Sequence, residues 1–222
     1  MACLSSNVTA CCWPGDTRRE RVGTLHQVII RNARPDEYAA VGELRVAAYR
    51  ELGLLPEGSG YAETLRRLGF GGDCVVLVAA DEAGGNTLGT IMLETFGPAN
   101  ELARDETEAD VRAFAVAPQT QGQGVGRKLL LAVIECAEKR GVRRLRLCTQ
   151  SAMKAAQHLY TTAGFSRTPD LDFEPVPGIT LRAYELALPL SPLPGRRLTD
   201  LSPSKPGSPG GLGNGSGDMR TL

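Results

Sequence analysis

The chain has 222 residues, of which 42% are hydrophobic and 23% charged, and its 25 Lys and Arg residues balance 25 Asp and Glu residues. This composition can bury one core, while the zero net charge gives no electrostatic reason to expect a nucleic acid or an anionic membrane as partner. The longest apolar runs, 74–80 and 129–134, are much shorter than the roughly 20 residues that span a bilayer. We therefore expect neither a nucleic-acid nor a membrane partner.

The cysteines and histidines give no sign of a disulfide scaffold or a metal site. There are six cysteines with no C-x-x-C pair, and the histidines are His26 and His158. Such spacing supplies no zinc ligand set. The start of the sequence, MACLSSNVTACC, lacks the basic and apolar segments of a secretory signal. We expect a reducing, cytoplasmic location and no metal.

Composition divides the chain into three predicted parts. Residues 1–24 show no periodicity, which indicates a flexible leader. Residues 189–222 are rich in Pro, Gly and Ser, and such a segment buries too little apolar surface to offset the entropy of ordering. It is predicted to be a disordered tail. The folded domain is predicted at 25–188.

Strand and helix patterns alternate along this domain. Pro35 with two acidic residues after it is typical of a helix start, and Ser151 is expected to cap a later helix that ends at Gly164. The predicted elements, in chain order, are a strand at 26–31, a helix from 35, a helix at 61–68, a strand at 74–80, a hairpin turn at 81–86, strands at 88–95 and 110–117, a helix at 125–140, a strand at 144–149, a helix from 151 to 164, and strands from 165 and at 179–188. This order predicts an α/β (α+β) fold with a mixed sheet flanked by helices.

A glycine-rich turn, Gln121-Gly122-Gln123-Gly124-Val125-Gly126-Arg127-Lys128, joins a strand to the most regular helix pattern. Three alternate glycines allow successive backbone N–H groups to point at one acceptor, and the helix start adds the positive end of its dipole. Arg127 and Lys128 oppose that dipole at a cost of about 0.3–1 kcal/mol each, unless an anion is bound. The turn therefore indicates a diphosphate site, and a tight loop with purely steric glycines is the alternative.

Two motifs together resemble a known family. Gln121-x-x-Gly124-x-Gly126, preceded by Phe114-Ala115-Val116-Ala117-Pro118, is similar to the acetyl-CoA-binding motif of the GNAT N-acetyltransferases. Met153-x-x-Ala156-x-x-Leu159-Tyr160-x-x-x-Gly164-Phe165 resembles the second motif of that family. The resemblance covers about 30–188 and looks like a subgroup common in high-GC bacteria. It implies a mostly antiparallel sheet with splayed central strands, and an enzyme that transfers acetyl from acetyl-CoA to a primary amine of a small molecule or peptide.

The resemblance also implies how the donor binds. Main-chain groups of Phe114 and Val116 would pair with the pantetheine arm, and an unpaired N–H at the splay would bond the thioester oxygen. The diphosphate would be held largely by backbone. Met153 stands where many family members carry Asn. The implied donor-binding residues are Phe114, Val116, Gln121, Gly122, Gln123, Gly124, Val125, Gly126 and Arg127.

Two residues are implied to be catalytic. Tyr160 matches the tyrosine whose hydroxyl lies beside the donor sulfur and assists the departing thiolate. By helix periodicity, Leu159 rather than Tyr160 is expected to face the sheet. Asp110 matches the acid of a Glu-x-Arg pattern and would accept the amine proton through a water molecule, with Glu108 as the alternative.

The acceptor and two other functions stay open. Acceptor specificity is expected to lie with Tyr38, Tyr49, Tyr61 and the loop 97–108, whose carboxylates would attract a cationic amine unless the loop is merely solvated. The chain would alternatively be an acyl-CoA-binding regulatory module without turnover, or a transferase that uses another donor such as succinyl-CoA. The oligomeric state is not predicted.

Overall fold

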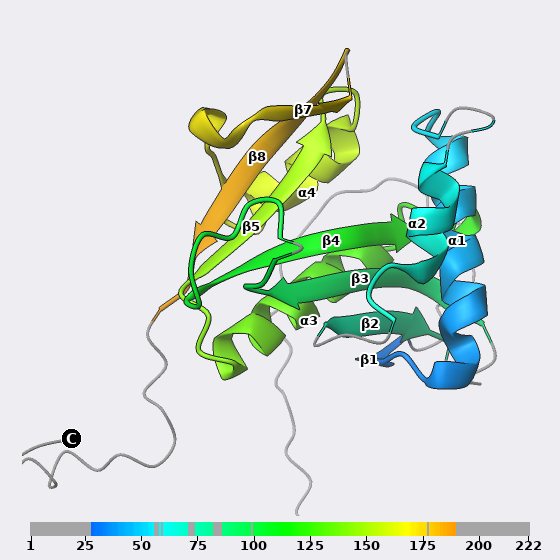
Figure 1. Cartoon of the computed structure of the whole chain (residues 1–222). Helices are drawn as coiled ribbons and strands as arrows, with labels where there is room; N and C mark the ends of the chain where they lie inside the picture. The colour runs from blue at the N-terminus through cyan, green and yellow to red at the C-terminus, as the bar shows by residue number, and fades with distance from the viewer. Residues whose placement is uncertain are drawn as a thin grey trace, which may run out of the picture.

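The computed structural model describes residues 28–55, 58, 60–70, 74–81, 86–98, 100–176 and 178–189. The predicted leader and nearly all of the predicted tail lie outside these ranges. The described residues form one mixed, mostly antiparallel sheet with helices on both faces (Figure 1), which confirms the expected fold class. In this part of the chain, no helix combines the length and apolar character needed to cross a bilayer.

The sheet has eight strands in the described residues, in the order β1-β2-β3-β4-β5-β8-β6, and β7 pairs with β8. The pairs are antiparallel except that of β4 with β5, which is parallel. The strands are β1 (Ile29–Asn32), β2 (Val75–Ala80), β3 (Thr87–Thr95), β4 (Glu108–Val116), β5 (Arg144–Gln150), β6 (Ser166–Arg167), β7 (Phe173–Val176) and β8 (Ile179–Ala187). The short strand β7 was not predicted from the sequence.

Four α-helices lie close to their predicted positions. They are α1 (Tyr38–Glu51), α2 (Tyr61–Arg67), α3 (Val125–Lys139) and α4 (Lys154–Thr162). The start predicted at Pro35 is a 3₁₀ turn, after which α1 begins. The prediction that Ser151 caps α4 is wrong, because Met153 occupies the cap position and no side chain caps this helix. Instead, the Gln157 side-chain amide holds α4 to the preceding segment, because it donates to the carbonyls of Gln150 and Ser151 at 3.0 Å each.

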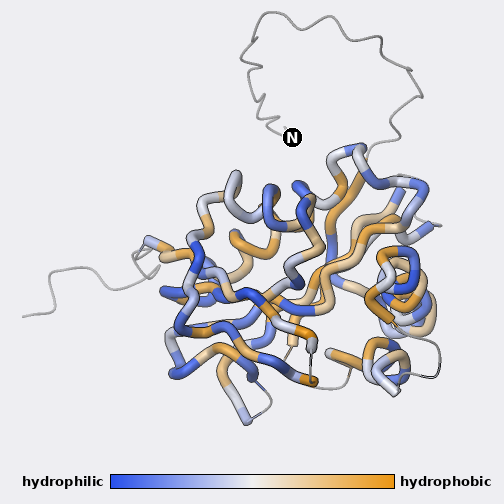
Figure 2. The backbone as a smooth tube through the Cα atoms, turned by 90° about the horizontal axis from the view of Figure 1, so that it is seen from above, coloured by the Kyte–Doolittle hydropathy of each residue, from blue (hydrophilic) through white to orange (hydrophobic). Residues whose placement is uncertain are grey.

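Alternating side chains of the strands supply two cores, one on each face of the sheet. Leu77 and Ala79 of β2 pack with the buried face of α3, whereas Val76 and Val78 of the same strand pack with Val41 of α1. This is the period-two pattern of a strand buried on both faces. Figure 2 colours the backbone by residue hydropathy. Hydrophobic residues are concentrated in the inner strands and are mixed with hydrophilic ones along the helices.

The two N-terminal helices are held together by a close contact and a buried cation. A Cβ on Gly42 would lie 2.7 Å from the Arg66 carbonyl oxygen, so only glycine permits this approach. The Arg45 guanidinium is buried and donates to the carbonyls of Leu65 at 3.4 Å and Leu68 at 2.6 Å, at the C-terminal end of α2. Burial lowers the pKa of Arg45 to about 10, and a cation at a helix C-terminus is favoured by the dipole. Arg45 therefore fixes α2 against α1.

Candidate active site

The central strands β4 and β5 pair for only part of their length. Parallel pairing joins 108–111 to 144–147 and stops there, although β4 runs to Val116 and β5 to Gln150. Beyond this point β4 pairs with β3 and β5 with β8 on their outer edges. The strands diverge, as Figure 1 shows, and each presents an edge with no strand partner to the opening. The expected splay is confirmed.

A β-bulge lies in β4 beside the splay. Residues 90–92 of β3 are matched by 112–115 of β4, so β4 carries one extra residue. Ala113 takes a φ of 49°, a left-handed conformation that costs a residue with a Cβ about 1–2 kcal/mol. The extra residue reverses the alternation, so Phe114 packs with the core on the α3 and α4 face, opposite to Arg112. Backbone strain of this kind is concentrated at functional sites.

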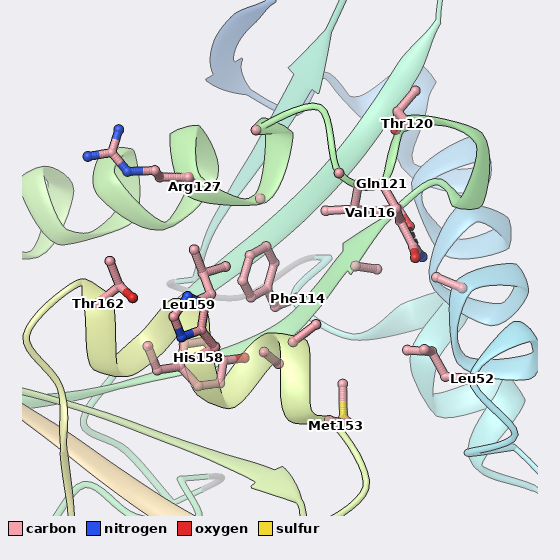
Figure 3. Close-up of a pocket in the computed structure, with 18 of the residues that line it drawn as sticks. Leu52, Phe114, Val116, Thr120, Gln121, Arg127, Met153, His158, Leu159 and Thr162 are labelled. Carbon is pink, nitrogen blue, oxygen red and sulfur yellow. Dashed lines mark hydrogen bonds between the residues drawn. The ribbon is translucent and has the colours of Figure 1, made fainter. Parts of the chain in front are cut away.

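A cavity of about 510 Å³ lies at the splay, bounded by α1, α4, the end of β4 and the glycine-rich turn (Figure 3). Most of the predicted donor-binding residues line it, namely Phe114, Val116, Gln121, Gly122, Gly124, Gly126 and Arg127. Gln123 and Val125 do not: Gln123 is exposed, and Val125 is buried in the core. The structure thus brings the first motif to one wall of one cavity.

The glycine-rich turn exposes unpaired amides at the start of α3. Gly122 and Gly124 take φ values of 76° and 80°, which residues with side chains rarely adopt. The first intrahelical bond of α3 is donated by the Lys128 amide to the Gly124 carbonyl at 3.1 Å, so the amides of 124–127 have no acceptor in the helix. No acid stands in this first turn. An anion here would meet free N–H groups and the positive dipole end together.

Arg127 is among the residues that line the cavity, but its guanidinium is directed away from Phe114. Figure 3 shows the guanidinium extended along α3, away from the ring of Phe114, and the residue is exposed. Contact with an anion at the turn therefore falls mainly to the backbone, and the Arg127 charge adds a solvent-screened attraction.

Tyr160 comes from α4 and reaches both the core and the cavity. It is 4% exposed, and its ring centroid lies 6.3 Å from that of Phe114 and 6.0 Å from those of Phe165 and Tyr184. The expectation that Leu159 rather than Tyr160 faces the sheet is wrong, because these aromatic rings form a buried site that helix periodicity does not reveal. Burial raises the pKa of the Tyr160 hydroxyl, so it remains a hydrogen-bond donor at neutral pH.

The two candidate bases lie outside the cavity lining. Asp110 is buried, and its Oδ2 accepts from the amides of Glu101 and Leu102 at 3.0 Å each, while its Oδ1 has no hydrogen-bond partner. Burial raises the pKa of Asp110, although these amides act in the opposite direction. Glu108 forms a buried ion pair with Arg146 at 2.7 Å. Of the two carboxylates, only that of Asp110 keeps an oxygen without a hydrogen-bond partner among the described residues.

The first helix contributes residues that the two motifs did not indicate. Tyr49 of α1 and Leu52, the residue that follows α1, line the cavity, as does His158 on α4. Burial raises the pKa of Tyr49. Tyr38, which was expected near the acceptor, stacks on Phe70 with centroids 4.1 Å apart and does not line the cavity.

The sequence profile of the acetyltransferase (GNAT) family matches residues 39–165, more than half of the chain. The chain belongs to this family. The matched residues run from α1 to the residue before β6 and so include both motifs and the splayed strands. A comparison of the sequence with curated proteins gave no match.

Solved structures of GNAT proteins share the fold. An acetyltransferase of the GNAT family from Staphylococcus aureus Mu50 is 18% identical, with a TM-score of 0.58 over 73% of this chain and 100% of that one. The ribosomal-protein-S18-alanine N-acetyltransferase from Escherichia coli is 20% identical, with a TM-score of 0.56 over 75% and 97%. The PaiA N-acetyltransferase from Thermoplasma acidophilum, in complex with coenzyme A, is 16% identical, with a TM-score of 0.56 over 73% and 99%.

As a GNAT acetyltransferase, the protein is an acyltransferase of a family that takes acetyl-CoA as donor. The features that suit such a donor are the free edge of β4, the unpaired amides of 124–127 and the Tyr160 hydroxyl. No group of three or more His, Cys, Asp or Glu side chains in the described ranges is placed to hold a metal ion.

Proposed function

We propose that this GNAT domain transfers an acetyl group from acetyl-CoA to a primary amine of a small molecule or peptide. The amine attacks the thioester directly, through a tetrahedral intermediate. One observation supports the proposal most directly. The free edge of β4, the amide-rich turn and Tyr160 all line the same cavity.

In this proposal the donor binds along the opening between β4 and β5. Main-chain groups of Phe114 and Val116 pair with the pantetheine arm, which takes the place of a strand. The diphosphate lies against the amides that precede Lys128. An N–H group near the Ala113 bulge is directed at the thioester oxygen, where a donor is worth more as negative charge develops.

Tyr160 is proposed to stabilise the departing thiolate. An ordinary tyrosine, with a pKa near 10, gives its proton to a thiolate near 8.5 only at a cost of ~2 kcal/mol. Burial raises the pKa of Tyr160, which makes complete transfer harder still. A hydrogen bond that strengthens as the sulfur gains charge is therefore the role that we assign to this hydroxyl.

Asp110 is proposed as the proton acceptor, working through water. An alkylammonium with a pKa near 10.4 is ~0.1% or less deprotonated at neutral pH, so the amine must lose a proton before attack. The Oδ1 atom of Asp110 has no hydrogen-bond partner among the described residues, and burial raises the pKa of Asp110, which makes this carboxylate a better base near neutral pH.

The test is an assay of thiol release from acetyl-CoA with a panel of amines, preceded by a binding measurement. Binding with amine-dependent thiol release supports the transferase. Binding without release for any amine would instead identify a regulatory acyl-CoA module, and release only from succinyl-CoA would identify another donor. We also propose a reducing, cytoplasmic setting.

A further inference from the structure

An aromatic pair leads from the cavity to the surface on the face of α1 and α2. Tyr49 lines the cavity, and its ring centroid lies 6.3 Å from that of Tyr61, at an interplanar angle of 52°. Tyr61 is 43% exposed. Tyr160 reaches the same cavity from α4, on the other face of the sheet. An acceptor that enters past the two tyrosines therefore approaches the thioester from the side opposite to Tyr160.

A surplus carboxylate stands beside this entrance. The Arg112 guanidinium donates to Glu94 at 2.9 Å and to Glu101 at 2.6 Å, so two carboxylates share one cation and leave one negative charge. The Glu94 side chain is 12% exposed and the Glu101 side chain 38%, so Glu101 is the carboxylate that a ligand can reach. The Glu101 charge also contributes to the raised pKa of Tyr61, after burial, which agrees with their proximity.

The position of Glu101 is fixed and close to the splay. Its backbone amide is held by the buried Asp110 carboxylate at 3.0 Å. Its Oε2 atom lies 4.0 Å from the Sγ atom of Cys148, the first residue of β5 beyond the pairing with β4. Among the described residues, Arg45 is the other cation near the tyrosines, but it is wholly buried and bonded to carbonyls at the end of α2. It therefore leaves the exposed side of the entrance to Glu101.

We propose that Glu101, which lies near Tyr61, binds a second positive charge on the acceptor, and that the preferred acceptors are alkyl diamines. A carboxylate beside aromatic faces suits an alkylammonium through charge-assisted hydrogen bonds and cation–π attraction. One amine, neutral, attacks the thioester, while the other stays charged and is anchored at Glu101. This inference rests on the proposed function and names its substrate class.

The test compares the four-carbon α,ω-diamine with butylamine, which has the same chain but one charge. We expect kcat/KM for the diamine to exceed that for butylamine by about tenfold, and Glu101→Gln to remove most of this preference through KM. Glu106 is an exposed carboxylate of the same loop. Glu106→Gln is therefore the matched control and should keep the preference for the diamine. A second variant, Tyr61→Leu, should raise KM for the diamine about threefold and leave butylamine unchanged.

The outcomes separate the two proposals. Turnover of both amines with equal kcat/KM, or a preference that survives Glu101→Gln, overturns the diamine inference and leaves the acetyltransferase intact. Turnover of a peptide N-terminus in preference to both amines also overturns it. Binding of acetyl-CoA with no turnover of any amine overturns the proposed function, and the inference with it.

Discussion

Replacing Tyr160 by Phe removes one hydroxyl from the centre of the proposed site. The ring keeps its packing against Phe114, Phe165 and Tyr184, and the described structure gives the hydroxyl no protein partner that the change would leave unpaired. We therefore expect the free energy of unfolding to stay within about 0.5 kcal/mol of the parent. Any large effect on activity then comes from chemistry and not from folding.

The size of that effect follows from the bond lost. A hydrogen bond to a charged group is worth about 1.5–3 kcal/mol, which corresponds to a reduction of kcat by about 10- to 150-fold. Affinity for acetyl-CoA should change little, because the thioester sulfur carries no charge before reaction. Steady-state thiol release measures kcat, and calorimetry measures donor binding.

Tyr184 provides the matched control. It is 3% exposed and lies against Tyr160, but it does not line the cavity. Tyr184→Phe should therefore leave kcat unchanged. An unchanged kcat in Tyr160→Phe, or an equal fall in both variants, would refute the assignment of Tyr160 to the departing thiolate.

Three further predictions follow from single charges. Arg127→Gln should weaken coenzyme A binding by about two- to fivefold at low salt and less at high salt. Lys128 is exposed and does not line the cavity, so Lys128→Gln should not weaken binding. Titration calorimetry at two salt concentrations tests both variants. Asp110→Asn should lower turnover at neutral pH, and turnover should recover at high pH, where the amine loses its proton unaided. A uniform loss across the pH profile would contradict the role as proton acceptor and show that Asp110 only anchors the loop. The ion pair with Arg31, at 2.5 Å, lowers the pKa of Glu37 to about 2. The contribution of this ion pair to the free energy of unfolding is therefore present above the unfolded pKa near 4.5 and is lost as pH falls toward 2. Glu37→Gln should thus reduce the free energy of unfolding at neutral pH by about 1 kcal/mol, and thermal melts at decreasing pH should show this difference shrinking; a constant difference would contradict it.

Patterns local in sequence predicted much of the fold. The spacing of apolar residues from Val125 placed α3 within one residue of its observed end, and the glycines before it marked the turn that starts the helix. The strand patterns at 74–80 and 88–95 predicted that β2 and β3 pair antiparallel, which the structure confirms. In these segments, periodicity and turn residues act within a few positions of one another.

Features that depend on contacts between residues far apart in the sequence could not be predicted from the sequence. The bulge at Ala113 lies where β4 has passed the end of its pairing with β5 and pairs with β3 alone, and alanine itself disfavours the conformation. Its consequence, the reversal that directs Phe114 to the α4 face, cannot be seen in the alternation of the sequence. The cap expected at Ser151 failed because the chain continues beyond β5 before turning into α4. Tyr49 was expected near the acceptor, but that it lines the cavity depends on how α1 lies over the opening, which neither motif records.

The central claim is that the splayed strands and the amide-rich turn together hold a pantetheine arm and its diphosphate. Titration calorimetry of the full chain with coenzyme A, in parallel with pantetheine, tests it most directly. Saturable one-to-one binding of coenzyme A, with pantetheine much weaker because it lacks the diphosphate, is the predicted result. Equal affinities would contradict the role of the turn, and no heat of binding with millimolar coenzyme A would contradict the site as a whole.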